Sequence, residues 1–149
     1  YEVRDQKVKY AEAVLTGASK QAAIEAAELE KDATLYRCHF EFPASLSLYI
    51  NDKQIDAIKD GMTYNSLQVQ YESLVDMVPS LTEEEKKQIY AWYKEAREFS
   101  MDAENSDKKH AAFNKYKGRI NNYLTKRGYD LVKERNEWYK RLKAAGKKI

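Results

Sequence analysis

The stretch Thr82-Glu83-Glu84-Glu85 restricts the fold more than any other feature, because it carries two separate signals for the start of a helix. The Thr82 hydroxyl can accept a hydrogen bond from the backbone amide of Glu85, and the Glu85 side chain can accept one from the amide of Thr82. Three acids in the first turn also suit the partial positive charge of a helix N-terminus. The sequence therefore predicts a helix from here to about Ala103.

Similar start and stop signals divide the rest of the chain into further helices. Gly17, Gly61 and Gly128 each follow a stretch with apolar residues at helical spacing, where a helix is expected to end. The predicted helices cover residues 2–16, 19–31, 51–61, 63–78, 82–103, 108–127 and 130–142. Residues 34–50 are ambiguous, since a strand is possible there, but a helix broken near Pro43 is favoured. In either form this apolar segment is expected to belong to the core.

These patterns predict an all-α fold: a single domain over residues 1–149, in which about six or seven helices pack as antiparallel hairpins. Five Gly and two Pro are few for a turn-rich β fold of this length. A net charge of +2 is too small to indicate a nucleic-acid partner. No apolar run is long enough to predict a transmembrane segment.

The predicted helix over residues 108–127 separates into an apolar side and a polar side. The apolar side, which is expected to face the core, consists of Phe113, Tyr116, Ile120, Tyr123 and Leu124. The polar residues form one stripe of His110, Asn114, Lys117 and Asn121, and a neighbouring stripe of Lys115, Arg119 and Asn122. Amides, a guanidinium group and tyrosine rings are groups that bind sugars or carboxylated sugars. A solvated helix face with an excess of Lys and Arg explains the same pattern, so both interpretations stay open.

Two further features of this region predict close packing. Gly118 lies in the middle of the helix, where glycine costs about 1 kcal/mol relative to alanine, so we expect a partner helix or a ligand to approach the backbone there. On the preceding helix, Glu95, Glu98 and Asp102 share one face. We expect these acids to form a salt-bridge layer with Lys and Arg side chains of the 108–127 helix.

The sequence contains no motif that indicates catalysis, and we expect no catalytic residue, no metal site and no cofactor. Its two histidines, His39 and His110, are far apart, and its single cysteine, Cys38, excludes a metal site built on cysteines. The P-loop, glycine-rich dinucleotide and Ser/His/Asp patterns are missing. Whether the protein is an enzyme stays open, with a non-enzymatic role favoured.

Several consecutive motifs resemble one known family. They are KDGMTY at 59–64, LTEEE at 81–85, EARE at 95–98, MDA at 101–103, KH at 109–110, KYKGRINNYL at 115–124 and GYDL at 128–131. Over residues 42–140 the chain resembles the domain-of-unknown-function family 3826 (DUF3826), a group of secreted, sugar-binding bacterial proteins found mostly in Bacteroidetes. The resemblance implies an exported helical protein, encoded near genes for polysaccharide degradation, and it supplies no catalytic residue.

The residues and the resemblance together lead to the hypothesis of a carbohydrate-binding protein, or an accessory protein of polysaccharide utilisation, whose ligand is an oligosaccharide or another glycan. We expect it in the periplasm or on the cell surface, with its signal peptide removed. The alternatives are a periplasmic protein-binding module similar to a chaperone, and a glycan-active enzyme with two facing carboxylates.

The ligand site is expected between the end of the 82–103 helix and the start of the 108–127 helix. The predicted ligand-binding residues are Tyr64, Arg97, Asp102, His110, Lys117, Arg119, Asn121 and Asn122. Asn121 and Asn122 lie about 100° apart on a helix, so only one of them can face a ligand squarely.

Overall fold

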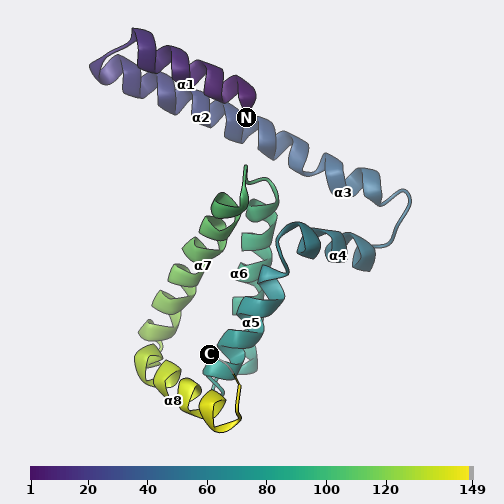
Figure 1. Ribbon diagram of the computed structural model, residues 1–149. Helices are drawn as coiled ribbons and strands as arrows, with labels where there is room; N and C mark the ends of the chain where they lie inside the picture. Colours follow the sequence, from purple (N-terminus) through teal and green to yellow (C-terminus); the bar gives the residue numbers. More distant parts are fainter. Residues whose placement is uncertain (148–149) are drawn as a thin grey trace. The chain divides into compact units, whose positions relative to one another are not determined.

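The computed structural model describes residues 1–147, and within this range it contains helices and no strands. The helices are α1 (Glu2–Val14), α2 (Gly17–His39), α3 (Glu41–Leu46), α4 (Asp52–Met62), α5 (Ser66–Met77), α6 (Glu83–Met101), α7 (Ser106–Lys126) and α8 (Leu131–Ala144) (Figure 1). Among these, α3 has six residues and the next shortest, α4, has eleven. The predicted all-α fold of about six or seven helices is confirmed, with α3 as one additional short helix. Lys148 and Ile149, the last residues of the predicted range, lie outside the described residues.

The contacts divide the chain into two compact units, one of residues 1–55 and one that begins at Asp56. The single domain over residues 1–149 stays a prediction. In the first unit, α1 and α2 form a hairpin closed by two residues, Leu15 and Thr16. Gly17 has a φ of +56°, a left-handed conformation that glycine adopts without strain.

Small side chains and ion pairs hold the α1–α2 hairpin together. Ala11 and Ala27 are buried where the two helices meet, and their size lets the backbones approach closely. Nη1 of Arg4 lies 2.9 Å from Oε1 of Glu28 across the hairpin. With so few buried apolar side chains, the hairpin depends on these polar contacts more than the second unit does.

The ambiguous segment 34–50 is helical as far as Leu46 and contains no strand, as the favoured prediction had it. Helix α2 ends at His39 and α3 begins at Glu41, because the ring of Pro43 removes one backbone donor and clashes with the carbonyl four residues earlier. The expectation that this segment is core is wrong: Tyr36 and Tyr49 are 67% and 85% exposed. The reason is length, since the start of α1, Tyr1, already lies beside Lys31 and α1 does not extend to the residues that follow.

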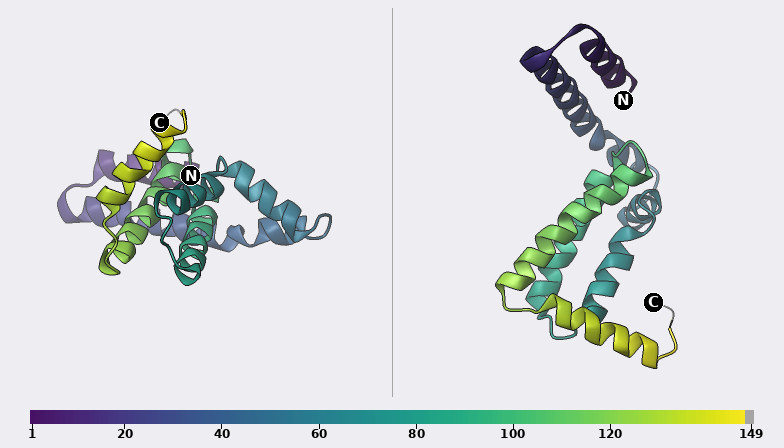
Figure 2. Two further views of the ribbon diagram at one scale, coloured as in Figure 1. Left: turned by 90° about the horizontal axis from the view of Figure 1, so that it is seen from below. Right: turned by 60° about the vertical axis from the view of Figure 1, so that its left-hand side comes forward.

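The second unit is built on α5, α6 and α7, which run antiparallel to one another in sequence order (Figure 1). Its core consists of Leu67, Leu74, Val78, Leu81, Ile89, Tyr93, Ala96, Phe113, Tyr116, Ile120 and Leu124. Helix α8 crosses the end of this layer and packs against α5 and α7 (Figure 2). None of the described helices combines the length and the apolar character that crossing a membrane requires.

The capping box at the start of α6 is present as predicted. The amide of Glu85 donates to Oγ1 of Thr82 at 3.2 Å, and the amide of Thr82 donates to Oε2 of Glu85 at 2.9 Å. The hydroxyl of Tyr129 also donates to Oε2 of Glu85 at 2.7 Å, which connects the turn between α7 and α8 to the start of α6. This hydrogen bond lowers the pKa of Glu85 and keeps the carboxylate charged.

The apolar side of α7 faces the core as predicted. Phe113, Tyr116, Ile120 and Leu124 are buried, and Tyr123 packs edge-to-face on Trp92 with 5.0 Å between ring centroids. The expected close approach of a partner helix to Gly118 is wrong, because a Cβ atom added there would meet no atom within 4 Å. Gly118 lies about 200° around the helix from both Tyr116 and Ile120, on the exposed side.

Candidate functional site

The predicted ligand-binding residues lie at several separate places around α6 and α7 and do not share one pocket. Arg97 is buried in an ion-pair cluster at the junction of α4 and α6. Tyr64 and His110 stack on each other near the start of α7. Lys117 and Asn121 line a groove farther along α7.

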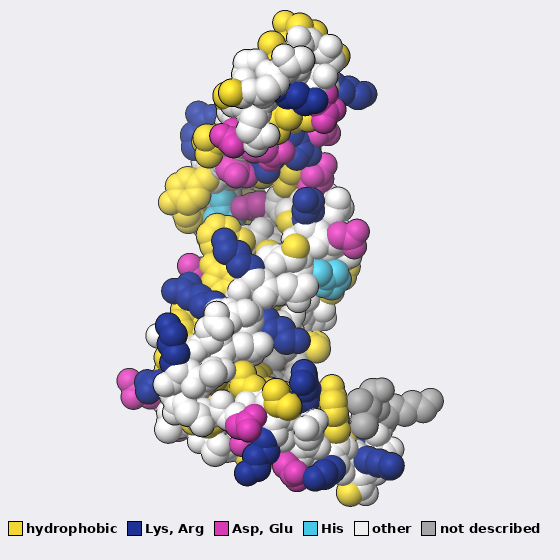
Figure 3. Space-filling view, turned by 90° about the vertical axis from the view of Figure 1, so that its left-hand side faces the viewer, with side chains coloured by type: hydrophobic (Ala, Val, Ile, Leu, Met, Phe, Trp, Pro, Cys, Tyr) yellow, Lys and Arg dark blue, Asp and Glu magenta, His cyan; other side chains and the backbone are white. Residues whose placement is uncertain are grey.

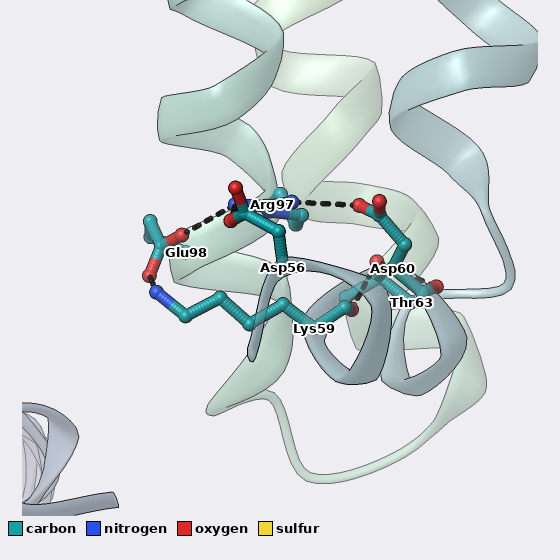
Figure 4. A network of polar contacts seen from close by, with 6 residues as sticks. All are labelled: Asp56, Lys59, Asp60, Thr63, Arg97 and Glu98. Atoms are coloured by element: carbon teal, nitrogen blue, oxygen red, sulfur yellow. Dashed lines mark hydrogen bonds and ion pairs between the residues drawn. The ribbon is translucent and has the colours of Figure 1, made fainter. Parts of the chain in front are cut away.

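Arg97 is 3% exposed and lies between two carboxylates of α4 (Figure 4). Its Nη1 atom lies 2.7 Å from Oδ1 of Asp60, and its Nη2 atom lies 2.6 Å from Oδ1 of Asp56. Burial by itself lowers the pKa of Arg97, but the hydrogen bonds to Asp60 and Asp56 raise it above its usual value. The guanidinium group therefore stays charged inside the protein and joins α4 to α6.

A second ion pair extends this cluster. Nζ of Lys59 lies 2.8 Å from Oε2 of Glu98, whose Oε1 is 3.3 Å from Nη2 of Arg97. Burial raises the pKa of Glu98, but the hydrogen bond and charge of Lys59, together with the charge of Arg97, lower it overall. The Thr63 hydroxyl donates to the carbonyl of Lys59 at 2.9 Å and closes the end of α4. Residues of the KDGMTY and EARE motifs thus hold two helices together.

One pair of the predicted salt-bridge layer between α6 and α7 is present. Glu95 pairs with Arg119 of α7 at 3.6 Å, and the Arg119 guanidinium also lies over the Trp92 ring, 4.8 Å from its centroid. Glu98 pairs with Lys59 of α4 and with Arg97, which lies next to it on α6.

Tyr64 lies beside the start of α7, as predicted. Its ring stacks on the imidazole of His110 with 5.6 Å between centroids and 21° between planes. Nζ of Lys109 donates to the carbonyl of Met62 at 2.9 Å, so the turn after α4 rests on α7 through two contacts. Asp102 follows directly after α6, in the connection to α7.

A groove of about 340 Å³ lies between α5, α7 and α8, with Tyr93 of α6 at its base. Its lining residues are Val69, Gln70, Ser73, Leu74, Met77, Tyr93, Lys117, Asn121, Leu131, Arg135, Trp138 and Tyr139. Its volume falls within the range of about 300–1,000 Å³ that is common for small-molecule sites. No Asp or Glu belongs to this lining.

Charged, amide and aromatic groups from three helices line the groove. Lys117 and Asn121 are four residues apart on α7 and therefore share one face. The rings of Trp138 and Tyr139 on α8 stack with 5.6 Å between centroids. From α5, Gln70 contributes an amide whose Oε1 atom is buried and has no hydrogen-bond partner among the described residues.

A hydrogen bond outside the groove fixes the Trp138 ring. Nε1 of Trp138 donates to Oδ2 of Asp76 at 2.6 Å, and Nη2 of Arg141 donates to the carbonyl of Asp76 at 2.7 Å. With its nitrogen held by Asp76, the indole ring lines the groove. A fixed aromatic face beside amide groups is an arrangement that can bind a polyol ring.

Sequence reasoning found two lining residues of the groove, Lys117 and Asn121, and missed Gln70 and the α8 residues. The spacing of Arg135, Trp138 and Tyr139, at i, i+3 and i+4, was a usable signal for a shared face on α8. Asn122 is exposed, about 100° around α7 from Asn121, so only one of the adjacent amides faces the groove, in line with the helical geometry.

The sequence model of one protein family, described as "Protein of unknown function (DUF3826)", matches residues 1–144. The chain belongs to the DUF3826 family. The match is wider than the stretch 42–140 that carried the resemblance, and it includes both the α1–α2 hairpin and the groove. No curated protein matches the chain. In this DUF3826 chain, the KDGMTY and EARE motifs account for the junction of α4 and α6, and KYKGRINNYL supplies both core and groove residues of α7.

Proposed function

We propose that the protein binds oligosaccharides in the groove between α5, α7 and α8. The observation that carries the proposal is a groove in which the Gln70 and Asn121 amides lie together with the Trp138 ring. Amide groups supply both donors and acceptors for sugar hydroxyls. The Trp138 ring could cover the apolar face of the same pyranose.

The groove favours binding over hydrolysis. Glycoside hydrolysis requires two carboxyl groups that face each other across the bond to be cleaved. The described residues that line this groove include no carboxylate. The role we propose is therefore that of a binding or accessory protein of polysaccharide utilisation.

The proposal includes export, to the periplasm or the cell surface, where fragments of external polysaccharides are available. It is supported by the family resemblance alone. Fractionation of a bacterium that produces the protein from its natural gene tests it directly. Recovery in the periplasmic or surface fraction is expected, and recovery with a cytoplasmic marker enzyme would contradict it.

Titration with a panel of oligosaccharides tests the binding proposal, with tryptophan fluorescence and calorimetry as readouts. The substitution Trp92→Phe leaves Trp138 as the only tryptophan, so a fluorescence change then reports on the groove. Saturable binding that Trp138→Ala removes is the expected result. If no panel member binds at millimolar concentration, or if Trp138→Ala leaves the affinity unchanged, the proposal is wrong.

A second candidate function, binding of another protein, is favoured by the exposed aromatic residues of α2 and α3. Phe40 packs edge-to-face with Tyr36, at 5.4 Å between centroids, and with His39, at 5.1 Å. Phe40 itself is 57% exposed, and exposed apolar groups of this kind are typical of interaction surfaces. An assay of protection against aggregation of an unfolded client protein tests this candidate. Protection that Tyr36→Ser and Phe40→Ser abolish would support it, and absence of protection would exclude it.

A further inference from the structure

We infer that the groove between α5, α7 and α8 selects acidic oligosaccharides, whose sugars carry carboxylates, over neutral ones. This inference rests on the proposed function and specifies its ligand. It follows from the charges around the groove, from the absence of lining acids, and from the neighbouring surface of α7.

The groove is lined by two cationic side chains, Lys117 and Arg135, and no described lining residue is an acid. Within the described chain, neither cation has an ion pair or a side-chain hydrogen bond. Some cationic side chains of the second unit have such partners, for example Lys59 with Glu98 and Lys140 with Glu137. Two unpaired cations at one groove, in a chain with 24 acids, therefore leave a positive charge that a ligand can neutralise.

One acid, Asp76, contacts a lining residue of the groove without lining the groove itself. Its carboxylate accepts the hydrogen bond from Nε1 of Trp138. Among the described residues, it forms no ion pair with Lys117 or Arg135.

Helix α7 extends the positive charge beyond the groove. It carries six Lys or Arg residues and a single acid, Asp107. In Figure 3, dark-blue Lys and Arg side chains are spread along the middle of the visible face, with few magenta acids among them. A surface of this kind attracts an anionic chain and raises the rate at which it reaches the groove.

The mixed character of the groove separates a sugar acid from other anions. Arg135 can bind a carboxylate through two parallel hydrogen bonds, and Lys117 can supply a second point charge. A simple anion would leave the Trp138 ring and the Gln70 and Asn121 amides unused, and an acidic peptide has no pyranose face to lie on the Trp138 ring. A uronic-acid oligomer uses all of these groups at once.

Calorimetric titration with a matched pair of ligands tests the inference: tetragalacturonic acid and its fully methyl-esterified form, which is neutral and has the same ring and linkage. The acid is expected to bind at least about tenfold more tightly, a difference that corresponds to one charge-assisted contact. Raising the salt concentration should weaken binding of the acid and leave binding of the ester unchanged. Polyglutamate of equal charge is included as the peptide probe.

Variants with a matched control locate the effect. Lys117→Met and Arg135→Met should each weaken binding of the acid by a larger factor than binding of the ester, and so reduce the preference for the acid. Lys126→Met, about 180° around α7 from Lys117, removes the same charge outside the groove and should change neither.

The outcomes distinguish this inference from the proposed function. Equal affinity for acid and ester would overturn the inference and leave oligosaccharide binding in place. No binding of the acid, the ester or the wider oligosaccharide panel would overturn both. Binding of polyglutamate as tight as that of the acid would show that the groove selects charge without a sugar, and would also overturn the inference.

Discussion

The Nη1 atom of Arg97 lies 2.7 Å from Oδ1 of Asp60, so that a charged hydrogen bond connects α6 to α4 inside the protein. The two residues belong to the EARE and KDGMTY motifs, which are separated by more than thirty positions in the sequence. Their contact gives a structural reason for the motifs: they form a junction between helices. Arg97 was predicted to bind a ligand, and in the structure its Nη1 and Nη2 atoms are already engaged by carboxylates.

Substitution of Asp60 by Ala is expected to lower the free energy of unfolding by about 2–3 kcal/mol, because it removes one partner of a buried charge. Glu95→Ala is the matched control, since it breaks the exposed pair with Arg119 and should cost less than about 1 kcal/mol. Urea denaturation followed by circular dichroism measures both values. Equal losses for the two variants would show that the buried cluster has no special role in stability.

The same cluster predicts a loss of stability in acid. Burial raises the pKa of Asp56 and of Glu98, but the contacts of Arg97 and Lys59 outweigh it, so both pKa values are lowered in the folded protein. A lowered carboxyl pKa stabilises the fold fully above the pKa of the unfolded chain, and this contribution disappears as the pH falls through the folded pKa. The free energy of unfolding should therefore fall below about pH 4.5, the ordinary value for Glu98.

Denaturant titrations at several pH values between about pH 7 and pH 3 check this prediction. The double variant Asp56→Asn, Glu98→Gln should be less stable at neutral pH and should lose less stability on acidification. A variant that keeps the full pH dependence of the wild type would assign the acid sensitivity to other carboxylates.

Gly118→Ala is expected to stabilise the protein by up to about 1 kcal/mol, because alanine is the better helix former and the added Cβ meets nothing within 4 Å. Gly128→Ala should instead destabilise it by about 1–2 kcal/mol, since Gly128 has a φ of +94° that alanine adopts only with strain. Thermal unfolding of the two variants gives the comparison. A lower melting temperature for Gly118→Ala would indicate that something does pack against α7 at this position.

Tyr129→Phe is expected to reduce the free energy of unfolding by about 1.5 kcal/mol or more, because the lost hydroxyl donates to the charged Glu85. Tyr139→Phe removes a hydroxyl from a partly exposed side chain and should cost less than about 0.5 kcal/mol. Both are conservative changes, so a difference between them reports on the hydrogen bond. Similar small losses would mean that the capping box holds Glu85 without help from Tyr129.

Local signals in the sequence predicted most of the fold. The Thr82 capping box, the Asp130 cap and the apolar spacing on α7 depend on residues within a few positions of one another, and each is present as expected. The burial of residues 34–50 depends on how far α1 extends along α2. Apolar residues at 36–49 therefore looked like core in the sequence and are largely exposed in the structure.

The candidate site was harder to predict because it depends on which helices become neighbours. Lys117 and Asn121 share a stripe on α7, and the sequence located them by spacing alone. Gln70 and Trp138 join them only because α8 packs against both α5 and α7, which no local pattern encodes. The partner of Glu98 was equally hard to predict, because Lys59 lies on another helix, 39 positions earlier in the sequence.

Asn121 and Asn122 provide the most direct test of the groove as the ligand site. The two adjacent side chains have the same chemistry and face different directions. The decisive measurement is the affinity of two variants, Asn121→Ala and Asn122→Ala. Calorimetry measures it with the oligosaccharide that the wild type binds most tightly, on variants of equal stability. The groove predicts at least about a tenfold loss for Asn121→Ala and no change for Asn122→Ala. Equal losses, or a loss confined to Asn122→Ala, would contradict the assignment of the groove as the ligand site.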